Sequence, residues 1–382
     1  MNPVALSGIA WNHTRGWLPM VATGARFSES HPDVSIRWER RSLQEFADMP
    51  LCELCRRFDL LVIDHPWIGT AAEEGLLVPL DDYLPEAYLK EQAEGAVGAS
   101  YRSYIWNGRP YALAVDAAAP VAAWRPDLLP GAAVPRTWGE VLDLAGRGRV
   151  LWAARPVGCM MAFYMMCVSL GSPLFADGNG VVDLAAGQEA LERLRGLAAR
   201  SPRVVFNFSP AAVYEAMTRE SGWTYCPFAY GYSTYAREGH ARRVLRFGEP
   251  VTLDGRPLVT VLGGAGLAVS SHCEAPEVAL EYLGMVASPL VQRTLYFDAG
   301  GQPGHRSAWL DADVNARSGG FFQSTLPALD RAWLRPRRPG YPAFQEVADE
   351  HVHRYLRDGG EAVRVLDALE DLHYAHLLRM SR

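Results

Sequence analysis

Two loops in the first seventy residues carry polar and aromatic side chains that suit a small polar ligand. The first holds Trp11, Asn12, His13 and Arg15, and the second holds Asp64, His65 and Trp67. A carboxylate such as Asp64 accepts hydrogen bonds from ligand hydroxyls, and an indole such as Trp67 stacks on an apolar ligand face. A helix that begins near Gly16 turns free N–H groups toward the first loop, which favours a carboxylate, phosphate or polyol.

Each loop also has a purely structural interpretation. Asn12 and Asp64 are residues that cap helices, and Trp67 could pack beneath its own loop. His13 and His65 could converge on a metal ion. Two histidines without a pattern of carboxylates are more often hydrogen-bonded structure, so the sequence predicts no metal site and no cofactor.

Later segments add further candidate ligand contacts. Aromatic residues with polar tips crowd 222–235, and such side chains can both stack on a ligand and hydrogen-bond to it. An aromatic core is the alternative, and for Tyr235 it is the preferred one. Two glycine pairs, Gly263–Gly264 and Gly300–Gly301, bring the backbone close to a hinge or a ligand. The predicted contacts from these parts of the chain are Asp116, Trp223, Tyr225, Tyr230, Tyr232, Gly264 and Gln302.

Cys159 lies near the expected start of a helix at Pro156, where the helix end would lower the pKa of its thiol. The methionines that follow it form an apolar environment, which raises that pKa instead. No histidine or glutamate lies within ten residues to act as a base. The sequence therefore predicts that Cys159 lines the ligand site or packs in the core, and it predicts no catalytic residue.

The elements that position these residues alternate between strand and helix. Strands are expected over Val4–Trp11, Val34–Trp38 and Asp59–Asp64, with helices ending near Phe27 and spanning Ser42–Phe58. This order predicts an α/β fold with an open parallel sheet, whose ligands lie at the carboxyl ends of the strands.

The rest of the chain is expected to contain a second strand–helix pattern over 150–260. Asn107–Gly108 predicts a hairpin turn, and Thr137 with Glu140 predicts a capped helix start. The segment Glu274–Tyr296 predicts one amphipathic helix, and the last 50 residues are expected to be helical.

Length and charge limit the class of protein. A chain of 382 residues predicts two or three α/β-sized units. The net charge of −6 gives no electrostatic reason to expect a nucleic-acid partner. No stretch reaches the roughly 18 apolar residues of a membrane span, and the start shows no export signal.

Five segments in order resemble family 1 of the bacterial extracellular solute-binding proteins, the sugar- and maltose-binding group of ABC importers. Phe58–Asp64 is similar to a strand-end segment of that family. Glu74–Tyr83 resembles its "GLLVPLDDY" segment, and Gly108–Asp116 resembles "GKIYALPVD". Trp124–Glu140 and Gly263–Ser270 are similar to later segments, the second of them a hinge strand.

The resemblance implies a two-lobed periplasmic-binding-protein-like (type II) fold with hinge crossovers and a ligand bound between the lobes. The lobes would be 1–115 plus 263–312 and 116–262 plus 313–382, crossing near Asp116 and Gly263. It also implies a monomer that captures a sugar, polyol or small acid for an ABC permease.

The alternative is a cytosolic enzyme or ligand sensor on the same scaffold, similar to thiaminases and using Cys159. The family resemblance implies a periplasmic location, whereas the chain as written, without an export signal, implies a cytoplasmic one.

Overall fold

A computed structural model describes residues 3–42, 50–176, 180–220 and 222–380. The chain divides into two compact units. The first unit comprises Met1–Ala118, Leu262–Ala316 and Arg337–Pro339, and the second comprises Ala119–Val261, Arg317–Pro336 and Gly340–Arg382. The first unit thereby includes 116–118, 262, 313–316 and Arg337–Pro339, which the bounds expected from the sequence assign to the second lobe.

The first unit is built on a five-stranded sheet with the order β2-β1-β3-β12-β6. Its strands are β1 (Val4–Trp11), β2 (Val34–Arg41), β3 (Leu60–Ile63), β6 (Leu113–Ala118) and β12 (Gly263–Val269). β1 pairs in parallel with β2 and β3, but β12 runs antiparallel to both β3 and β6. The sheet is therefore mixed and not wholly parallel as expected, because the chain re-enters this unit beside the end of β6, where Gly263 pairs with Ala118.

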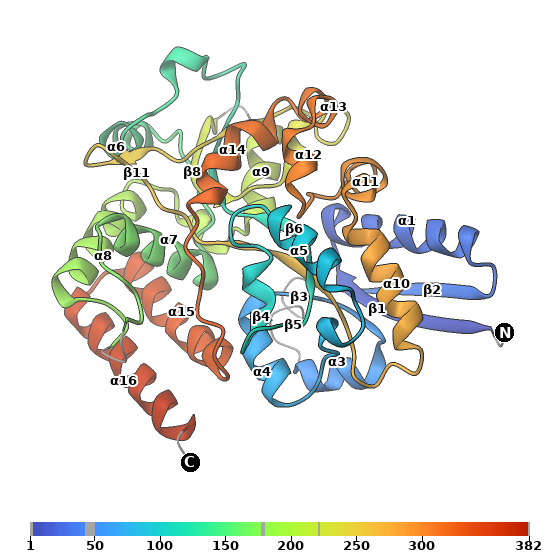
Figure 1. Ribbon diagram of the computed structural model, residues 1–382. Helices are drawn as coiled ribbons and strands as arrows, with labels where there is room; N and C mark the ends of the chain where they lie inside the picture. Colours follow the sequence, from blue (N-terminus) through green and yellow to red (C-terminus); the bar gives the residue numbers. More distant parts are fainter. Residues whose placement is uncertain (1–2, 43–49, 177–179, 221, 381–382) are drawn as a thin grey trace. The chain divides into compact units, whose positions relative to one another are not determined.

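Alternating side chains on these strands build a core on each face of the sheet. Along β3, Leu60 and Val62 join one core, while Leu61 and Ile63 join the other. The helices α1 (Thr14–Ser30) and α10 (Pro276–Ala287) cover the first face, and Figure 1 shows them beside β1 and β2. The short helices α3 (Leu51–Arg57) and α4 (Ile68–Glu73) cover the second face.

The second unit has a smaller sheet and more helix. Its central strand β7 (Pro120–Trp124) pairs antiparallel with β8 (Tyr225–Tyr230) and β9 (Arg246–Gly248). The described strands of the second strand–helix pattern expected over 150–260 belong to antiparallel sheets. Four helices pack together within this unit, as Figure 1 shows in green and red. They are α7 (Pro156–Ser169), α8 (Leu184–Ala198), α15 (Tyr341–Asp358) and α16 (Ala362–Met380).

The remaining elements are short. The helices are α5 (Glu86–Glu94), α6 (Trp138–Gly146), α9 (Pro210–Arg219), α11 (Pro289–Val291), α12 (Arg306–Leu310), α13 (Ala312–Arg317) and α14 (Phe321–Asp330). The strands are β4 (Ile105–Trp106), β5 (Arg109–Pro110), β10 (Thr252–Leu253) and β11 (Arg256–Pro257). Single tighter turns include η1 (His65–Trp67), and a π turn, η7, spans Gln292–Tyr296.

Two local predictions are confirmed. Asn107 and Gly108 join β4 to β5 with φ values of 48° and 83°, the positive values that a type I′ turn requires. Thr137 and Glu140 form a reciprocal capping box at the start of α6.

Two expected helices differ from the sequence prediction. The helix expected over Glu274–Tyr296 ends at Ala287, and Ser288 starts a new turn in which Pro289 has no N–H to donate. The helix expected over Ser42–Phe58 is observed as α3, and residues 43–49 of it lie outside the described residues.

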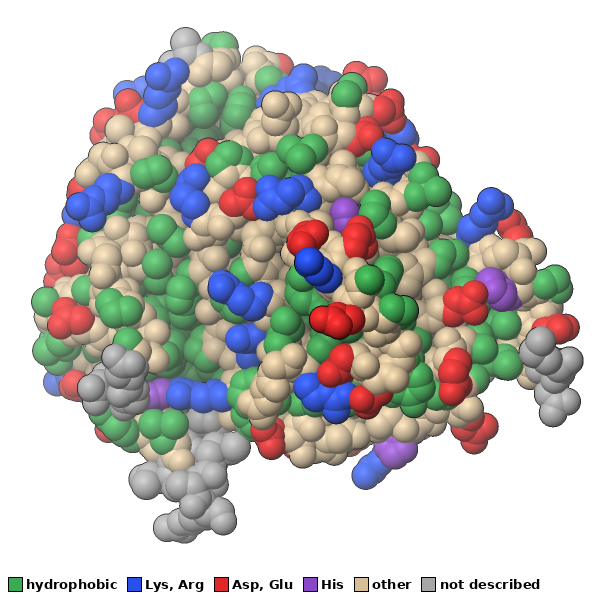
Figure 2. Space-filling model, in the orientation of Figure 1, with side chains coloured by type: hydrophobic (Ala, Val, Ile, Leu, Met, Phe, Trp, Pro, Cys, Tyr) green, Lys and Arg blue, Asp and Glu red, His purple; other side chains and the backbone are tan. Residues whose placement is uncertain are grey.

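Charged side chains of both signs occur on the face of the molecule that Figure 2 shows. Figure 2 shows acidic and basic side chains interspersed over the face in view, which agrees with the modest net charge of −6. Among the described residues, no helix combines the length and apolar character needed to cross a bilayer.

Candidate functional site

The first loop follows β1 and is held by the start of α1. His13 is the N-cap, and its Nδ1 accepts a hydrogen bond from the Arg15 backbone N–H at 3.0 Å. Capping therefore falls to His13 and not to Asn12, the residue considered for it from the sequence. The Asn12 N–H instead donates to the Arg41 carbonyl at 2.7 Å. Asn12 is left exposed and His13 half-buried.

Trp11 lies beneath this loop and is buried. A Cβ added to Gly16 would lie 2.3 Å from the Trp11 indole, so the first turn of α1 rests directly on that ring. Trp11 belongs to the core on the α1 face of the sheet. Its structural contribution is to support the loop from below.

The fold brings together Arg15 and Asp116, which are 101 positions apart in the sequence. The Arg15 Nε donates to Asp116 Oδ2 at 2.7 Å, and its Nη2 donates to Oδ1, which gives a two-pronged ion pair. Both side chains are at least 95% buried. Burial raises the pKa of the Asp116 carboxyl, and the charge and hydrogen bonds of Arg15 oppose that rise.

The second loop follows β3 at the same edge of the sheet. β1 and β3 are paired in parallel, so their carboxyl ends lie side by side. Asp64 caps the η1 turn, with its Oδ1 accepting from the His65 N–H at 2.9 Å and lying 3.1 Å from His65 Nδ1. Asp64 and Trp67 are half-buried, whereas His65 is fully buried with its ring edge against Tyr104.

Gly264 and Gln302 are placed around the end of β6. Gly264 has a φ of 116°, and a Cβ there would lie 2.2 Å from the Asp116 carbonyl oxygen, so only glycine fits. The buried Gln302 donates from Nε2 to the Ala117 carbonyl at 2.8 Å. Both residues therefore fix the backbone at Asp116 and Ala117.

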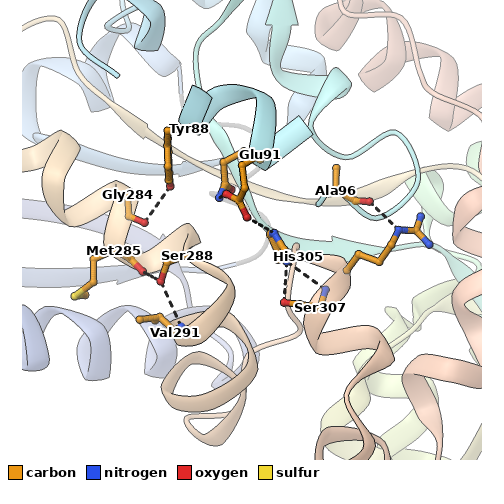
Figure 3. Close-up of polar contacts among 11 residues, drawn as sticks. Tyr88, Glu91, Ala96, Gly284, Met285, Ser288, Val291, His305 and Ser307 are labelled. Carbon is orange, nitrogen blue, oxygen red and sulfur yellow. Dashed lines mark hydrogen bonds and ion pairs between the residues drawn. The ribbon is translucent and has the colours of Figure 1, made fainter. Parts of the chain in front are cut away.

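His305, which no sequence motif marks as a site residue, anchors the segment that carries Gln302. Figure 3 shows the His305 ring between Glu91 and Ser307. Its Nε2 lies 3.2 Å from Glu91 Oε1 on α5, and its Nδ1 accepts from the Ser307 N–H at 3.2 Å, capping α12. Burial lowers the pKa of His305 below its ordinary value. No local pattern marks this residue, because its partner Glu91 is 214 positions away.

The aromatic segment of the second unit is mostly packed inside it. Tyr225 is fully buried, and its hydroxyl has no hydrogen-bond partner in the described part of the chain. Tyr232 is buried, with its ring 6.2 Å from that of Tyr214. Tyr230 and Trp223 are half-buried, and the Trp223 Nε1 donates to Glu220 at 2.7 Å.

Tyr214 on α9 organises this segment and was missed by sequence reasoning. Its hydroxyl donates to the carbonyls of Ala229 and Tyr230 at 3.0 and 3.1 Å. The alternative of an aromatic core is confirmed for Tyr235, which is buried beside Tyr214 with ring centroids 5.4 Å apart.

Cys159 lies in the first turns of α7 and is fully buried. Its thiol donates to the Ala154 carbonyl at 3.1 Å. Burial raises the pKa of this thiol well above its ordinary value, and Asp349 and Glu350 raise it further. The geometry therefore keeps the sulfur protonated and away from solvent. Within the described ranges, no group of three or more His, Cys, Asp or Glu side chains could hold a metal ion.

Solved structures of similar fold come from several bacteria. One is the maltose-bound T. maritima MalE3, which is 17% identical, with 98% of this chain and 99% of that one covered and a TM-score of 0.81. A ribitol complex of an ABC transporter solute-binding protein from Agrobacterium radiobacter K84 is 18% identical, with 99% of both chains covered and a TM-score of 0.83. A solute-binding protein from Thermotoga lettingae TMO bound to α-D-tagatose is 19% identical, with 98% of this chain and 100% of that one covered and a TM-score of 0.80. These likenesses establish the two-lobed binding-protein fold.

The sequence itself matches a family model over residues 55–319, which include Asp64, Asp116 and the aromatic segment. On this match, the chain belongs to the bacterial extracellular solute-binding proteins.

Proposed function

We propose that this protein binds an uncharged sugar or polyol and presents it to an ABC permease. Candidate ligand contacts come from both units. In the first unit these contacts are Asn12, His13, Asp64 and Trp67, and in the second they are Trp223 and Tyr230. The side chains of all six are at least partly accessible.

One observation carries the choice of ligand class. At the edge where β1 and β3 end, a half-buried carboxylate and a half-buried indole lie in one loop, beside a loop whose Asn12 is exposed. Carboxylate and amide groups exchange hydrogen bonds with hydroxyls, while an indole covers the apolar face of a sugar ring. The charges of Arg15 and Asp116 neutralise each other, so this pair adds no net charge that would select an ionic ligand.

The family match and the solved structures of similar fold also support the proposal. The neighbours named above hold maltose, ribitol and α-D-tagatose, which are all uncharged and rich in hydroxyls. A thiol-dependent activity is not part of the proposal, because Cys159 is fully buried and its pKa is raised.

A thermal-shift screen tests the ligand class. Maltose, ribitol and D-tagatose are compared with D-glucuronate, which represents a small acid. A sugar or polyol at 100 times its dissociation constant should stabilise the folded protein by about 2.7 kcal/mol. Stabilisation by D-glucuronate alone would contradict the proposal of an uncharged ligand.

Two substitutions locate the site within the first unit. Asp64→Asn keeps an oxygen that can cap η1 but removes the charge, so it should weaken ligand binding with little loss of stability. Its matched control is Asp183→Asn, which alters another helix-capping aspartate, at the start of α8. Trp67→Ala should abolish stacking, and its control is Trp106→Ala, a half-buried indole in β4. Equal losses of ligand affinity in the control variants would show that Asp64 and Trp67 are not ligand contacts.

A further inference from the structure

We propose that Arg15 and Asp116 form a positioning pair, which fixes the Asn12–Thr14 loop to the end of β6 without contacting the ligand. The role assigned to this loop in ligand binding rests on the proposed function, whereas the fixing of the loop does not.

Arg15 holds the loop from two sides. Its backbone N–H donates to the His13 ring at 3.0 Å, and its guanidinium reaches Asp116 through two hydrogen bonds. The side chain of Arg15 is 5% exposed and that of Asp116 is 1% exposed. The loop is thereby tied through one residue to a strand that lies 101 positions further along the chain, and the charged groups face each other instead of solvent.

The Asp116 end of the pair is itself held in place. The Ala117 N–H donates to the Gln302 carbonyl at 3.3 Å, and Gln302 Nε2 donates back to the Ala117 carbonyl at 2.8 Å. Pro303 forms a β-bridge with Asp116, and Gly264 packs against its carbonyl oxygen. The acceptor of the ion pair therefore belongs to a stretch of backbone with little freedom to shift.

Asp116 lies close to the point where the chain leaves the first unit. β6 ends at Ala118, where the chain leaves the first unit, and β12 begins one residue after the chain returns at Leu262. Arg15 thus connects a candidate ligand loop to the strands at which the two units are joined. A planar guanidinium can form this two-pronged arrangement, whereas a lysine ammonium cannot reproduce it.

Hydrogen–deuterium exchange tests the fixing of the loop without any ligand. In Arg15→Lys, the amides of residues 12–16 should exchange at least tenfold faster than in the wild type. The matched control is Arg125→Lys in the second unit, where Arg125 forms the same two-pronged pair with Asp127 at 2.7 Å. The control should accelerate exchange near residue 125 and leave 12–16 unchanged.

A second variant keeps the test decisive if Arg15→Lys fails to fold. In Arg15→Met/Asp116→Leu, two apolar side chains replace the buried charges. Such a replacement often leaves the free energy of unfolding unchanged or raises it. Exchange of residues 12–16 should again be at least tenfold faster. Wild-type exchange at 12–16 in a folded variant of either kind would overturn the proposal.

Titration calorimetry with maltose, ribitol and D-tagatose tests the link to the ligand. The sugar or polyol that binds the wild type should bind both variants at least tenfold more weakly. If the double variant loses binding while Arg15→Lys keeps it, Arg15 is a direct ligand contact and the proposal fails. If the wild type binds none of the three, the proposed ligand class fails, and the exchange experiment still decides the positioning role.

Discussion

The polar loops of the first unit and the aromatic segment of the second are held by different forces. The loops around His13 and Asp64 are fixed by directional contacts, in which a side chain caps a helix or pairs with an opposite charge. The segment around Tyr225 and Tyr232 is fixed mainly by burial and ring packing. Hydrogen bonds to charged groups depend steeply on geometry, whereas apolar packing depends on area and volume.

This difference predicts how each region responds to substitution. The polar loops should be sensitive to changes that conserve charge but alter shape, as from arginine to lysine. The aromatic segment should tolerate a change from tyrosine to phenylalanine where the hydroxyl has no hydrogen-bond partner among the described residues, as at Tyr225.

The largest expected effect comes from breaking the buried ion pair on one side. Asp116→Asn leaves the Arg15 guanidinium buried without its counter-charge, which typically costs about 3–5 kcal/mol of unfolding free energy. Urea unfolding of wild type and variant measures this loss. The double variant Arg15→Met/Asp116→Leu should recover most of it. A loss below about 1 kcal/mol in Asp116→Asn would show that the pair is worth no more than an exposed one.

A smaller loss is expected where the first loop rests on its core residue. Gly16→Ala would place a Cβ 2.3 Å from the Trp11 indole and should cost about 1–3 kcal/mol through the forced shift of the ring. Gly139→Ala is the control, because this exposed glycine in the first turn of α6 has open space around it and should gain up to about 1 kcal/mol in helix propensity. Thermal unfolding of both variants measures these changes in stability. A Gly16→Ala variant that is more stable than the wild type would show that the Trp11 ring does not limit the space at Gly16.

Two tyrosines of the second unit, Tyr214 on α9 and Tyr225 in the aromatic segment, form a matched pair. Tyr214→Phe removes a hydroxyl that donates to two carbonyls and should cost about 1–1.5 kcal/mol. Tyr225→Phe removes a buried hydroxyl that has no hydrogen-bond partner among the described residues, so it should be neutral or slightly stabilising. Urea unfolding measures both variants. Equal losses in the free energy of unfolding would mean that the Tyr225 hydroxyl also forms a stabilising hydrogen bond.

The smallest effect is expected in the alkylation of the cysteines, because burial protects most of the thiols in the folded protein. Cys52 is half-buried and the other cysteines are buried, so near pH 7.5 a thiol-alkylating reagent should label Cys52 first. Burial raises the pKa of Cys55 to about 12 and that of Cys273 to about 11. The folded state therefore favours the protonated thiols of Cys55 and Cys273. Their contribution to the free energy of unfolding is complete below the ordinary thiol pKa of about 8.5, and it is lost as the pH rises above that value.

Mass spectrometry of the native protein measures the order of labelling. Cys159→Ser should leave ligand affinity nearly unchanged, since the serine hydroxyl can replace the thiol as donor to Ala154. Fast labelling of Cys159 that ligand suppresses would contradict this prediction and favour a thiol-dependent activity.

Much of the site's framework follows from local sequence patterns. The buried run Asp59–Asp64 predicts a strand with a polar end, and parallel pairing then brings its loop beside that of β1. The turn at Asn107–Gly108 and the capping box at Thr137 depend only on neighbouring residues, so both could be predicted from the sequence.

The partners of the charged residues could not be predicted in the same way. The sequence lists Arg15 and Asp116 as separate candidate contacts, because it shows that a residue is charged but not which distant residue pairs with it. The reversed direction of β12 depends on where the chain returns from the second unit, and no local pattern encodes that. Helix capping by His13 instead of Asn12 depends on the φ and ψ of one residue, which the composition of the loop leaves open.

Hydrogen–deuterium exchange of the wild type with and without its tightest-binding sugar or polyol tests the central claim most directly. The account predicts slower exchange in two peptides of the first unit, one covering Trp11–Thr14 and the other Asp64–Trp67. It also predicts slower exchange in the peptide that contains Trp223 and Tyr230 in the second unit. Binding that leaves both first-unit peptides unchanged and protects another part of the chain would contradict it.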